Sequence, residues 1–356
     1  MTTKTKSSNP SGSDDLLEND ITALKKDIAK MKKGMARIRK EIAKMKRDFL
    51  SEGDNIFGDR NCTKATDEDD DIIGDEDDIG VINNAGGTLL HQAVVLDVHS
   101  LANLLASPEF DVDAKDNNGR TSLHLAVAED WRDETIKLLI SNGANVNAKD
   151  KNGESPLHLA TRNKSFGATE IVRLLVSEGA DIYARDNTGR TPLHSAAQES
   201  EFKVKFLISQ GADVHAKDED GHTPLDVAAH NKRIDVMSLL ISEGANVHTK
   251  DNQGRTPLYW AVGKTKRFVP NGDYVNAIKL LVSYGADVNV KDNDGRTPLH
   301  SAVLANKLDT VKFLVSCEAD VYTKDHDGKT PLDRAKEKGN TVVSEYLASI
   351  VAKPQE

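Results

Sequence analysis

Cysteine and long apolar runs are nearly absent from this chain of 356 residues. Its two cysteines, Cys62 and Cys317, cannot form a disulfide framework. There is no apolar run of 18 residues and no hydrophobic N-terminal segment, which argues against a membrane span and against export. We therefore expect a protein of the cytoplasm, with the nucleus as the alternative.

Motifs that carry catalytic chemistry are also absent. The sequence contains no Cys-x-x-Cys pair, no His-Glu-x-x-His, no phosphate-binding loop and no nucleophile elbow. A calcium loop starting at Asp69 fails because Ile73 occupies a ligand position. We expect a protein that is not an enzyme and has no cofactor, no metal and no small-molecule substrate.

One short phrase recurs along most of the chain. It reads DNNGRTSLH at Asp116–His124, DNTGRTPLH at Asp186–His194 and DNDGRTPLH at Asp292–His300. The recurring glycines are Gly86, Gly119, Gly153, Gly189, Gly221, Gly254, Gly295 and Gly328. Their intervals are 33, 34, 36, 32, 33, 41 and 33 residues. A period near 33 predicts a row of small units in which each unit contacts only its neighbours.

Each unit is predicted to contain a turn, two short helices and an extended return. Asp and Gly at the first and fourth places suit a tight turn. Thr191 and Pro192 illustrate the next step, a helix N-cap followed by proline at the first helical position. A second, more apolar helix ends at Gly-Ala, as at Gly179, where glycine favours the left-handed stop.

These residues resemble the ankyrin repeat. The turn glycine with Thr-Pro-Leu-His, and Leu-Leu ahead of Gly-Ala, recur in register from Gly86 onward, about three quarters of the chain. The resemblance implies an all-α solenoid of about eight helix-turn-helix units over residues 81–356, with β-hairpin loops projecting from one edge. It also implies that partner proteins bind the concave face formed by these loops and the first helices.

Five histidines share one position of the repeated phrase. They are His91, His124, His158, His194 and His300, and Asp226, Tyr259 and Asp333 interrupt the series. The resemblance implies that these histidines form hydrogen bonds between the turns of neighbouring units. Because they lie one repeat apart, they do not converge on a metal or a catalytic centre.

Repeat six departs most from the pattern. It is longer by about eight residues, inserted within Gly263–Asp273, and it carries Tyr259, Trp260 and Phe268. These aromatics either fill space around the insertion or form a recognition hot spot, because Trp and Tyr are enriched at such sites. In repeat seven Glu318 stands where glycine is expected, which predicts a strained or differently closed helix end.

Exposed turn tips are the other candidates for partner binding, because the fold places few demands on them. The candidate tip residues are Asn117, Asn118, Asn187, Thr188, Glu219, Asp220, Asn252 and Gln253. A basic residue follows the turn glycine in many repeats, as at Arg120 and Arg255, and resembles a common feature of the family rather than a separate basic strip.

A second kind of order precedes the repeats, in residues 14–50. Apolar residues step by four and three through Leu17, Ile21, Leu24, Ile28, Met31, Met35, Ile38, Ile42, Met45 and Phe49. This is the heptad seam of a coiled coil. Parallel pairing sets acids against bases, as in Asp20–Lys25, Asp27–Lys32 and Glu41–Lys46, whereas antiparallel pairing sets like charges together. We predict a parallel homodimer, with a trimer as the lesser alternative.

The rest of the N-terminal region is predicted to be disordered. Residues 51–80 form a linker with 12 acids and 2 bases, and residues 1–13 are rich in Ser, Thr and Lys. Residues 21–47 carry eleven bases against two acids, which leaves a nucleic-acid-binding or membrane-binding helix open. No aromatic side chain in that stretch can stack on a base or anchor at a membrane, so we expect neither role.

Together these patterns predict a non-enzymatic interaction scaffold or adaptor. A protein partner would bind the concave hairpin and inner-helix face, and the N-terminal coiled coil would make the chain a dimer. One alternative is a host-directed ankyrin effector of an intracellular bacterium, secreted into a host cell. Another is a nucleic-acid-associated regulator that uses the basic helix.

Overall fold

The computed structural model describes residues 87–352, apart from 97, 109, 129–132, 166 and 264–270. The described residues lie within one compact unit, Gly80–Glu356. The predictions for residues 1–13, 14–50 and 51–80, including the ten seam residues of the coiled coil, lie outside the described residues.

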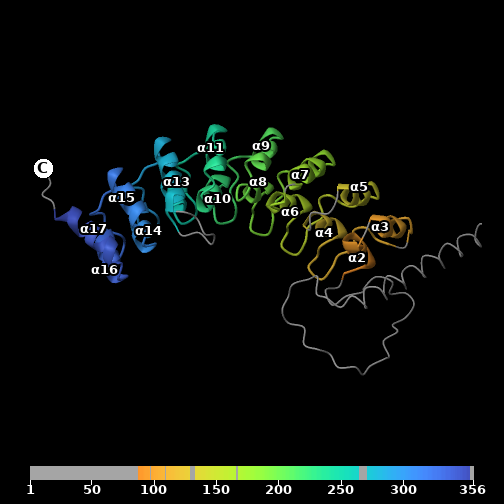
Figure 1. Cartoon of the computed structure of the whole chain (residues 1–356), viewed down its shortest axis with the longest axis horizontal. Coiled ribbons are helices and arrows are strands. Elements are labelled where there is room, and N and C mark those ends of the chain that lie inside the picture. The colour runs from red at the N-terminus through yellow and green to blue at the C-terminus, as the bar shows by residue number, and fades with distance from the viewer. Residues whose placement is uncertain are drawn as a thin grey trace, which may run out of the picture. The chain divides into compact units, whose positions relative to one another are not determined.

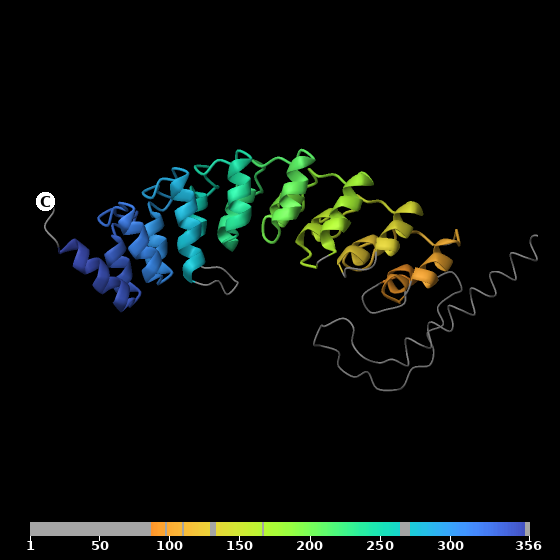
Figure 2. The ribbon, with the colours of Figure 1, turned by 45° about the horizontal axis from the view of Figure 1, so that its top comes forward.

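The described part of the chain is helical and arranged in eight pairs (Figure 1). The first, inner helix of each pair is α2 (Leu89–Leu96), α4 (Ser122–Ala128), α6 (Pro156–Arg162), α8 (Pro192–Ala196), α10 (Pro224–Asn231), α12 (Pro257–Val262), α14 (Pro298–Leu304) or α16 (Pro331–Glu337). The second, outer helix is α3 (Val98–Leu105), α5 (Asp133–Ser141), α7 (Ala168–Ser177), α9 (Glu201–Ser209), α11 (Ile234–Ser242), α13 (Asn271–Ser283), α15 (Leu308–Ser316) or α17 (Thr341–Val351). Successive pairs lie side by side in one row (Figure 2). The predicted all-α solenoid is confirmed.

Most inner helices begin where Thr-Pro predicted. Thr223 has extended backbone angles (φ −98°, ψ 165°) and precedes Pro224 at the start of α10. Its Oγ1 accepts a hydrogen bond from the Asp226 amide, and Asp226 Oδ2 accepts from the Thr223 amide at 2.7 Å. This capping box satisfies amides that the first helical turn leaves without intrahelical partners.

Several outer helices end at a left-handed glycine, as predicted. Gly179 has φ 86°, and the following Ala180 donates its amide to the Leu175 carbonyl at 2.9 Å. Glu318 adopts the same conformation with φ 65°, and Ala319 donates to the Leu314 carbonyl at 3.0 Å. Glu318 therefore closes α15 in the usual way, but with a side chain in a region that disfavours one.

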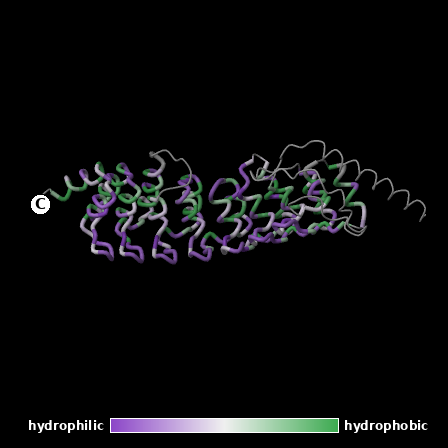
Figure 3. Tube along the Cα trace, turned by 90° about the horizontal axis from the view of Figure 1, so that it is seen from below, coloured by the Kyte–Doolittle hydropathy of each residue, from purple (hydrophilic) through white to green (hydrophobic). Residues whose placement is uncertain are grey.

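The projecting loops are tight turns capped by their own aspartates. Asp116 Oδ1 accepts hydrogen bonds from the Asn118 and Arg120 amides, both at 2.8 Å. The Asp116 amide also donates to the Arg120 carbonyl at 2.9 Å, which closes a hairpin-like loop. No strand occurs among the residues that the structure describes. Hydrophilic residues gather along the loop edge of the row, and hydrophobic residues lie along the helices (Figure 3).

Consecutive turns are joined to one another by backbone hydrogen bonds. The Lys151 amide donates to the Asn118 carbonyl at 2.9 Å, and equivalent bonds continue from turn to turn as far as His326, which donates to Asp294. The turns pack closely, since a β-carbon placed on Gly189 would lie 2.8 Å from the Glu219 amide nitrogen. Gly189 is therefore required both by its φ of 77° and by the approach of the next turn.

The core lies between and within the helix pairs. Inner helices are short and buried almost all round, as in α4, where Ser122 through Val127 are all buried. Outer helices bury one face, as in α7 with Ile171, Val172 and Leu175. The other face of the outer helices is exposed, and the turns together with the inner helices form the opposite face, which we call the inner face.

Candidate partner-binding face

The predicted turn tips are exposed on the inner face. All eight tip residues, Asn117, Asn118, Asn187, Thr188, Glu219, Asp220, Asn252 and Gln253, are exposed. The side chains of Asn117, Asn118, Glu219 and Asp220 make no hydrogen bond or ion pair within the described part of the chain.

Some tip side chains also serve the fold. Asn187 Nδ2 donates to the Lys151 carbonyl of the preceding turn at 2.8 Å. Asn252 Nδ2 makes the equivalent bond to the Glu219 carbonyl, also at 2.8 Å. Asn at the first tip position thus links two turns, so these two residues are less free for a partner than sequence reasoning supposed.

Each ladder histidine joins two repeats. His194 Nδ1 accepts from the Thr191 amide at 3.1 Å and lies 2.9 Å from Thr191 Oγ1, while His194 Nε2 lies 3.1 Å from the His222 carbonyl oxygen. A nitrogen that accepts from an amide carries no proton, so Nε2 is the protonated nitrogen and donates across the joint. Burial lowers the pKa of His194 to about 4. The predicted structural role of this series is confirmed by geometry.

The same arrangement recurs at the other ladder positions. The ring Nε2 reaches the carbonyl of the residue after the next turn glycine at 2.8 Å for His91, 3.2 Å for His124, 3.0 Å for His158 and 3.2 Å for His300. Burial lowers the pKa of each of these histidines. They form a linear series one repeat apart and do not converge.

Three of the basic residues after the turn glycine pair with turn aspartates. Arg120 pairs with Asp116 at 2.8 Å, and Arg255 pairs with Asp251 at 2.8 Å. Arg190 reaches into the next repeat, where its Nε lies 3.5 Å from Asp218 Oδ2. In these three repeats the base is a partner of a turn aspartate, whereas Arg296 pairs with the tip residue Asp294 and Lys329 pairs with Glu337.

Trp260 lies within an internal network and is half-buried. Its Nε1 donates to Asp251 Oδ2 at 3.2 Å, and the Arg255 guanidinium lies 4.2 Å from its ring centroid. The rings of His222 and His230 meet it edge-on at 4.9 Å and 5.5 Å. Trp260 thus packs across the joint between repeats five and six, with its polar atom already bound.

The other two aromatics of the predicted hot spot differ in position. Tyr259 is half-buried at the ladder position, and burial raises its pKa. Phe268 lies outside the described residues. Tyr259 and Trp260 are neighbours on α12, and their role in recognition stays a prediction.

The sequence analysis did not predict a row of basic side chains in which each one donates a hydrogen bond to a backbone carbonyl of the next repeat. Lys115 Nζ donates to the Lys149 carbonyl at 2.8 Å, and Lys149 Nζ donates to the Arg185 carbonyl at 2.8 Å. Arg185 and Lys217 repeat this contact with the carbonyls of Lys217 and Lys250. The signal was present, because a base precedes the turn aspartate in each of these repeats.

Two buried lysines were also missed. Lys203 of α9 is 2% exposed, and its Nζ donates to the carbonyls of Ala160, Thr161 and Asn163 at the end of α6. Lys232 is 5% exposed and donates to the Trp260 carbonyl at 2.9 Å.

No group of three His, Cys, Asp or Glu residues that could hold a metal occurs in the described ranges. Among those same residues, no helix has the length and apolar character needed to cross a membrane.

The repeated fold agrees with a family match over most of the sequence. Matches to ankyrin repeats, described as three copies each, cover residues 70–150, 128–218, 203–269 and 267–355. The chain belongs to the ankyrin repeat family. Ankyrin repeats are generally modules for protein–protein interaction and are typically without enzymatic activity.

Two viral ankyrin proteins are similar to part of this chain. Ankyrin repeat protein 14 of vaccinia virus (strain Western Reserve) is 40% identical over 63 residues, 18% of this chain and 27% of the viral protein. An ankyrin repeat domain-containing protein of monkeypox virus is 40% identical over 63 residues, 18% of this chain and 10% of that protein. The chain thus spans about a quarter and a tenth of these relatives, so the likeness concerns the repeats and not the whole proteins.

Proposed function

We propose that this protein is a non-enzymatic scaffold or adaptor of the cytoplasm that binds a partner protein through the inner face of its ankyrin array. The observation that carries this proposal is the row of exposed turn tips. Asn117, Asn118, Glu219 and Asp220 offer hydrogen-bonding and charged groups that the fold leaves unused. Side chains with these properties, presented on a rigid scaffold, suit selective recognition.

Tyr259 and Trp260 would contribute apolar area to this face. Trp260 is held in place by Asp251 and Arg255, so a partner that covers its remaining surface would lose little side-chain entropy on binding. Tyr259, Trp260 and Phe268 remain our candidates for the recognition hot spot.

We further propose that residues 14–50 join two copies of the chain in a parallel coiled coil. Two arrays in one particle would bind a dimeric or repetitive target with avidity. The support is the apolar seam from Leu17 to Phe49 and the complementary charges at its flanks.

Site-specific photo-cross-linking tests the binding face. A photoreactive residue at Asn117 or Glu219 of the full-length chain should capture the partner. The same residue at Lys205 or Glu243, exposed on or beside outer helices, is the matched control and should capture much less. Capture from the outer positions alone would place the partner on the opposite face and refute the proposal.

Light scattering tests the coiled coil. The full-length chain should have twice the mass of one subunit, and a chain that begins at Ser51 should have the mass of one. Ile28→Asp should produce the same dissociation in the full-length chain, because a charge in the seam opposes pairing. Equal subunit numbers in all three proteins would eliminate the dimer.

A further inference from the structure

The contact between repeat five (residues 218–250) and repeat six (residues 251–291), which we call the 5/6 joint, differs in its polar contacts from the joint that precedes it. At the 4/5 joint, between repeats four and five, a neutral ladder histidine, His194, donates across the boundary. At the 5/6 joint Asp226 occupies the ladder position, and His222 replaces the arginine found after the turn glycine of repeats four and six. Both replacements are ionisable groups.

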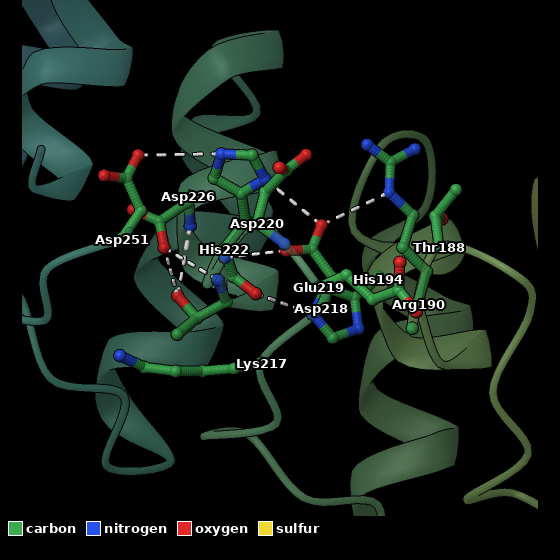
Figure 4. A network of polar contacts seen from close by, with 12 residues as sticks. Thr188, Arg190, His194, Lys217, Asp218, Glu219, Asp220, His222, Asp226 and Asp251 are labelled. Carbon is green, nitrogen blue, oxygen red and sulfur yellow. Dashed lines mark hydrogen bonds and ion pairs between the residues drawn. The ribbon is translucent and has the colours of Figure 1, made fainter. Parts of the chain in front are cut away.

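His222 lies between the capping aspartates of two successive turns (Figure 4). Its Nδ1 is 3.1 Å from Asp218 Oδ2, and its Nε2 is 3.6 Å from Asp251 Oδ2. Nε2 makes no hydrogen bond at that distance, but a protonated imidazole forms ion pairs with both carboxylates, whereas a neutral one carries no charge to pair with either. Protonation of His222 therefore forms a bridge from repeat five to repeat six.

Other charged groups around this bridge are paired with the same carboxylates. Arg190 approaches Asp218 from repeat four at 3.5 Å, and Arg255 binds Asp251 within repeat six at 2.8 Å. Trp260 covers one edge of the His222 ring and donates to Asp251. His222 is the member of this network whose charge changes near neutral pH.

Asp226 presents one satisfied and one unsatisfied oxygen. Its Oδ2 accepts from the amide and from Oγ1 of Thr223, both at 2.7 Å. Its Oδ1 is buried and has no hydrogen-bond partner. A histidine at this position directs Nε2 at the carbonyl after the next turn glycine, which by register is the Arg255 carbonyl. The aspartate side chain is too short to place an oxygen where histidine places Nε2, so this bond is missing at the 5/6 joint. An ionised Asp226 instead repels Asp251 of repeat six across the joint, whereas a protonated Asp226 does not.

The two groups respond to pH in the same sense. Burial raises the pKa of Asp226 to about 6. Interaction with Asp251 raises the pKa of His222, and burial opposes that rise. Raised pKa values mean that the closed joint binds protons more tightly than the open one, so its stability is lost as pH rises. For Asp226 this loss falls between pH 3.8 and about 6, and for His222 it falls above 6.5.

Lys232 holds the other end of the same joint without sharing this response. Its Nζ donates to the Ala229, His230 and Trp260 carbonyls, and Lys307 is the nearby cation that repels it. Burial lowers the pKa of Lys232 from 10.5 to about 7. The free energy that Lys232 contributes to the closed joint therefore rises with pH above about 7. Below pH 6.5 it stays charged and its contribution is nearly constant.

We propose that the 5/6 joint is a proton-operated hinge that closes under mild acid, while the 4/5 joint beside it loosens under the same change. The closed form has protonated His222 bridging two aspartates and an uncharged Asp226 that does not repel Asp251. The hinge divides the inner face into a segment before Asp251 and a segment after it, so protonation governs how rigidly the two segments are connected.

Hydrogen exchange at two matched amides tests this hinge in the full-length protein. The Asn252 amide donates across the 5/6 joint to Asp220, and the Glu219 amide donates across the 4/5 joint to Thr188, both at 2.9 Å. Between pH 5.0 and 6.5, after correction for intrinsic rates, protection of Asn252 should fall about eightfold and protection of Glu219 should rise about tenfold. A change of both in the same direction would overturn the proposal.

Variants separate titration from packing. Asp226→Asn keeps the size of the side chain and stays neutral at every pH, so the fall at Asn252 should shrink to less than twofold. Asp333→Asn is the matched control, because the Thr330 hydrogen bonds lower the pKa of Asp333, and the Asn252 response should be unchanged. A full Asn252 response in Asp226→Asn would also overturn the proposal.

Discussion

A buried histidine that accepts at one ring nitrogen and donates at the other is restricted to its neutral form. In His158 the acceptor nitrogen faces the Ser155 amide at 3.2 Å, and the donor nitrogen lies 3.0 Å from the Arg190 carbonyl oxygen. Protonation would turn a second N–H toward the Ser155 amide hydrogen. The arrangement adds a repulsive contact to the cost of burying a charge.

The ladder histidines make the array sensitive to acid. Their folded pKa values lie below the unfolded value near 6.5, so their stabilisation is complete above 6.5 and is lost as pH falls toward the folded value. His194, with a pKa of about 4, alone should cost about 2 kcal/mol between pH 7 and 5. Urea unfolding followed by circular dichroism at both values measures the loss.

His194→Gln provides the control for this prediction. The glutamine amide can accept from Thr191 and donate to the His222 carbonyl without titrating. The variant should therefore lose less stability on acidification than the wild type. An identical loss in both proteins would show that other groups cause the acid sensitivity.

Glu318 is the helix-stop residue where a stabilising substitution is expected. Glu318→Gly should raise the free energy of unfolding by about 1 kcal/mol, because glycine adopts φ 65° without a steric penalty. Gly285→Ala is the reverse test, at φ 85° with no atom within 4 Å of the added β-carbon, and should lower it by a similar amount. Chemical denaturation measures both, and a destabilised Glu318→Gly would contradict the strain argument.

At the scale of the element, several short inner helices depend on neighbours for their C-terminal caps. Asn163 Nδ2 donates to the Val127 carbonyl of α4 at 3.2 Å, and Asn340 Nδ2 donates to the Val303 carbonyl of α14 at 2.8 Å. Lys203 performs this task for α6, where its charge also complements the negative end of the helix dipole. Each such helix is thus completed by another repeat.

Lys203→Met should destabilise the array. Removing the ammonium leaves three carbonyls at the end of α6 without this donor, at a cost of about 2–4 kcal/mol. Lys205→Met, two residues away on the exposed face of α9, should change stability by less than about 0.5 kcal/mol. Thermal and urea unfolding of both proteins provide the comparison, and equal effects would rule out the capping role.

Local rules predicted the elements well, and long-range contacts lay beyond them. The Thr223 cap, the Gly179 stop and the left-handed Glu318 each follow from residues a few positions apart. The contacts of Lys203 do not, because its acceptors are backbone carbonyls about forty residues earlier, and a carbonyl has no signature in the sequence. Likewise, the sequence showed the aromatic cluster that contains Trp260. It did not show that Asp251 accepts a hydrogen bond from the Trp260 indole nitrogen.

At the scale of the whole array, cohesion is a sum of contacts between adjacent repeats. Duplicating residues 186–217, one full 32-residue interval by the turn glycines, should therefore give a longer folded array with equal or greater thermal stability. Circular dichroism should show helicity rising in proportion to length. Inserting four residues between Asp186 and Gly189 should instead unfold at least the adjoining repeats, and a fully stable insertion variant would contradict this prediction.

The bonds between consecutive turns have a consequence for how such a chain can diverge. Each turn forms backbone hydrogen bonds with one neighbouring turn, so the array can lengthen only by the addition of whole repeats. Smaller insertions are tolerated only in segments whose length no neighbouring repeat fixes. The 41-residue interval of repeat six is an addition of that kind, between α12 and α13. It leaves the flanking pairings of Asn252 with Asp220 and of Asn293 with Gln253 intact. New residues can thus be inserted between the two helices of a repeat without changing the pairing of consecutive turns.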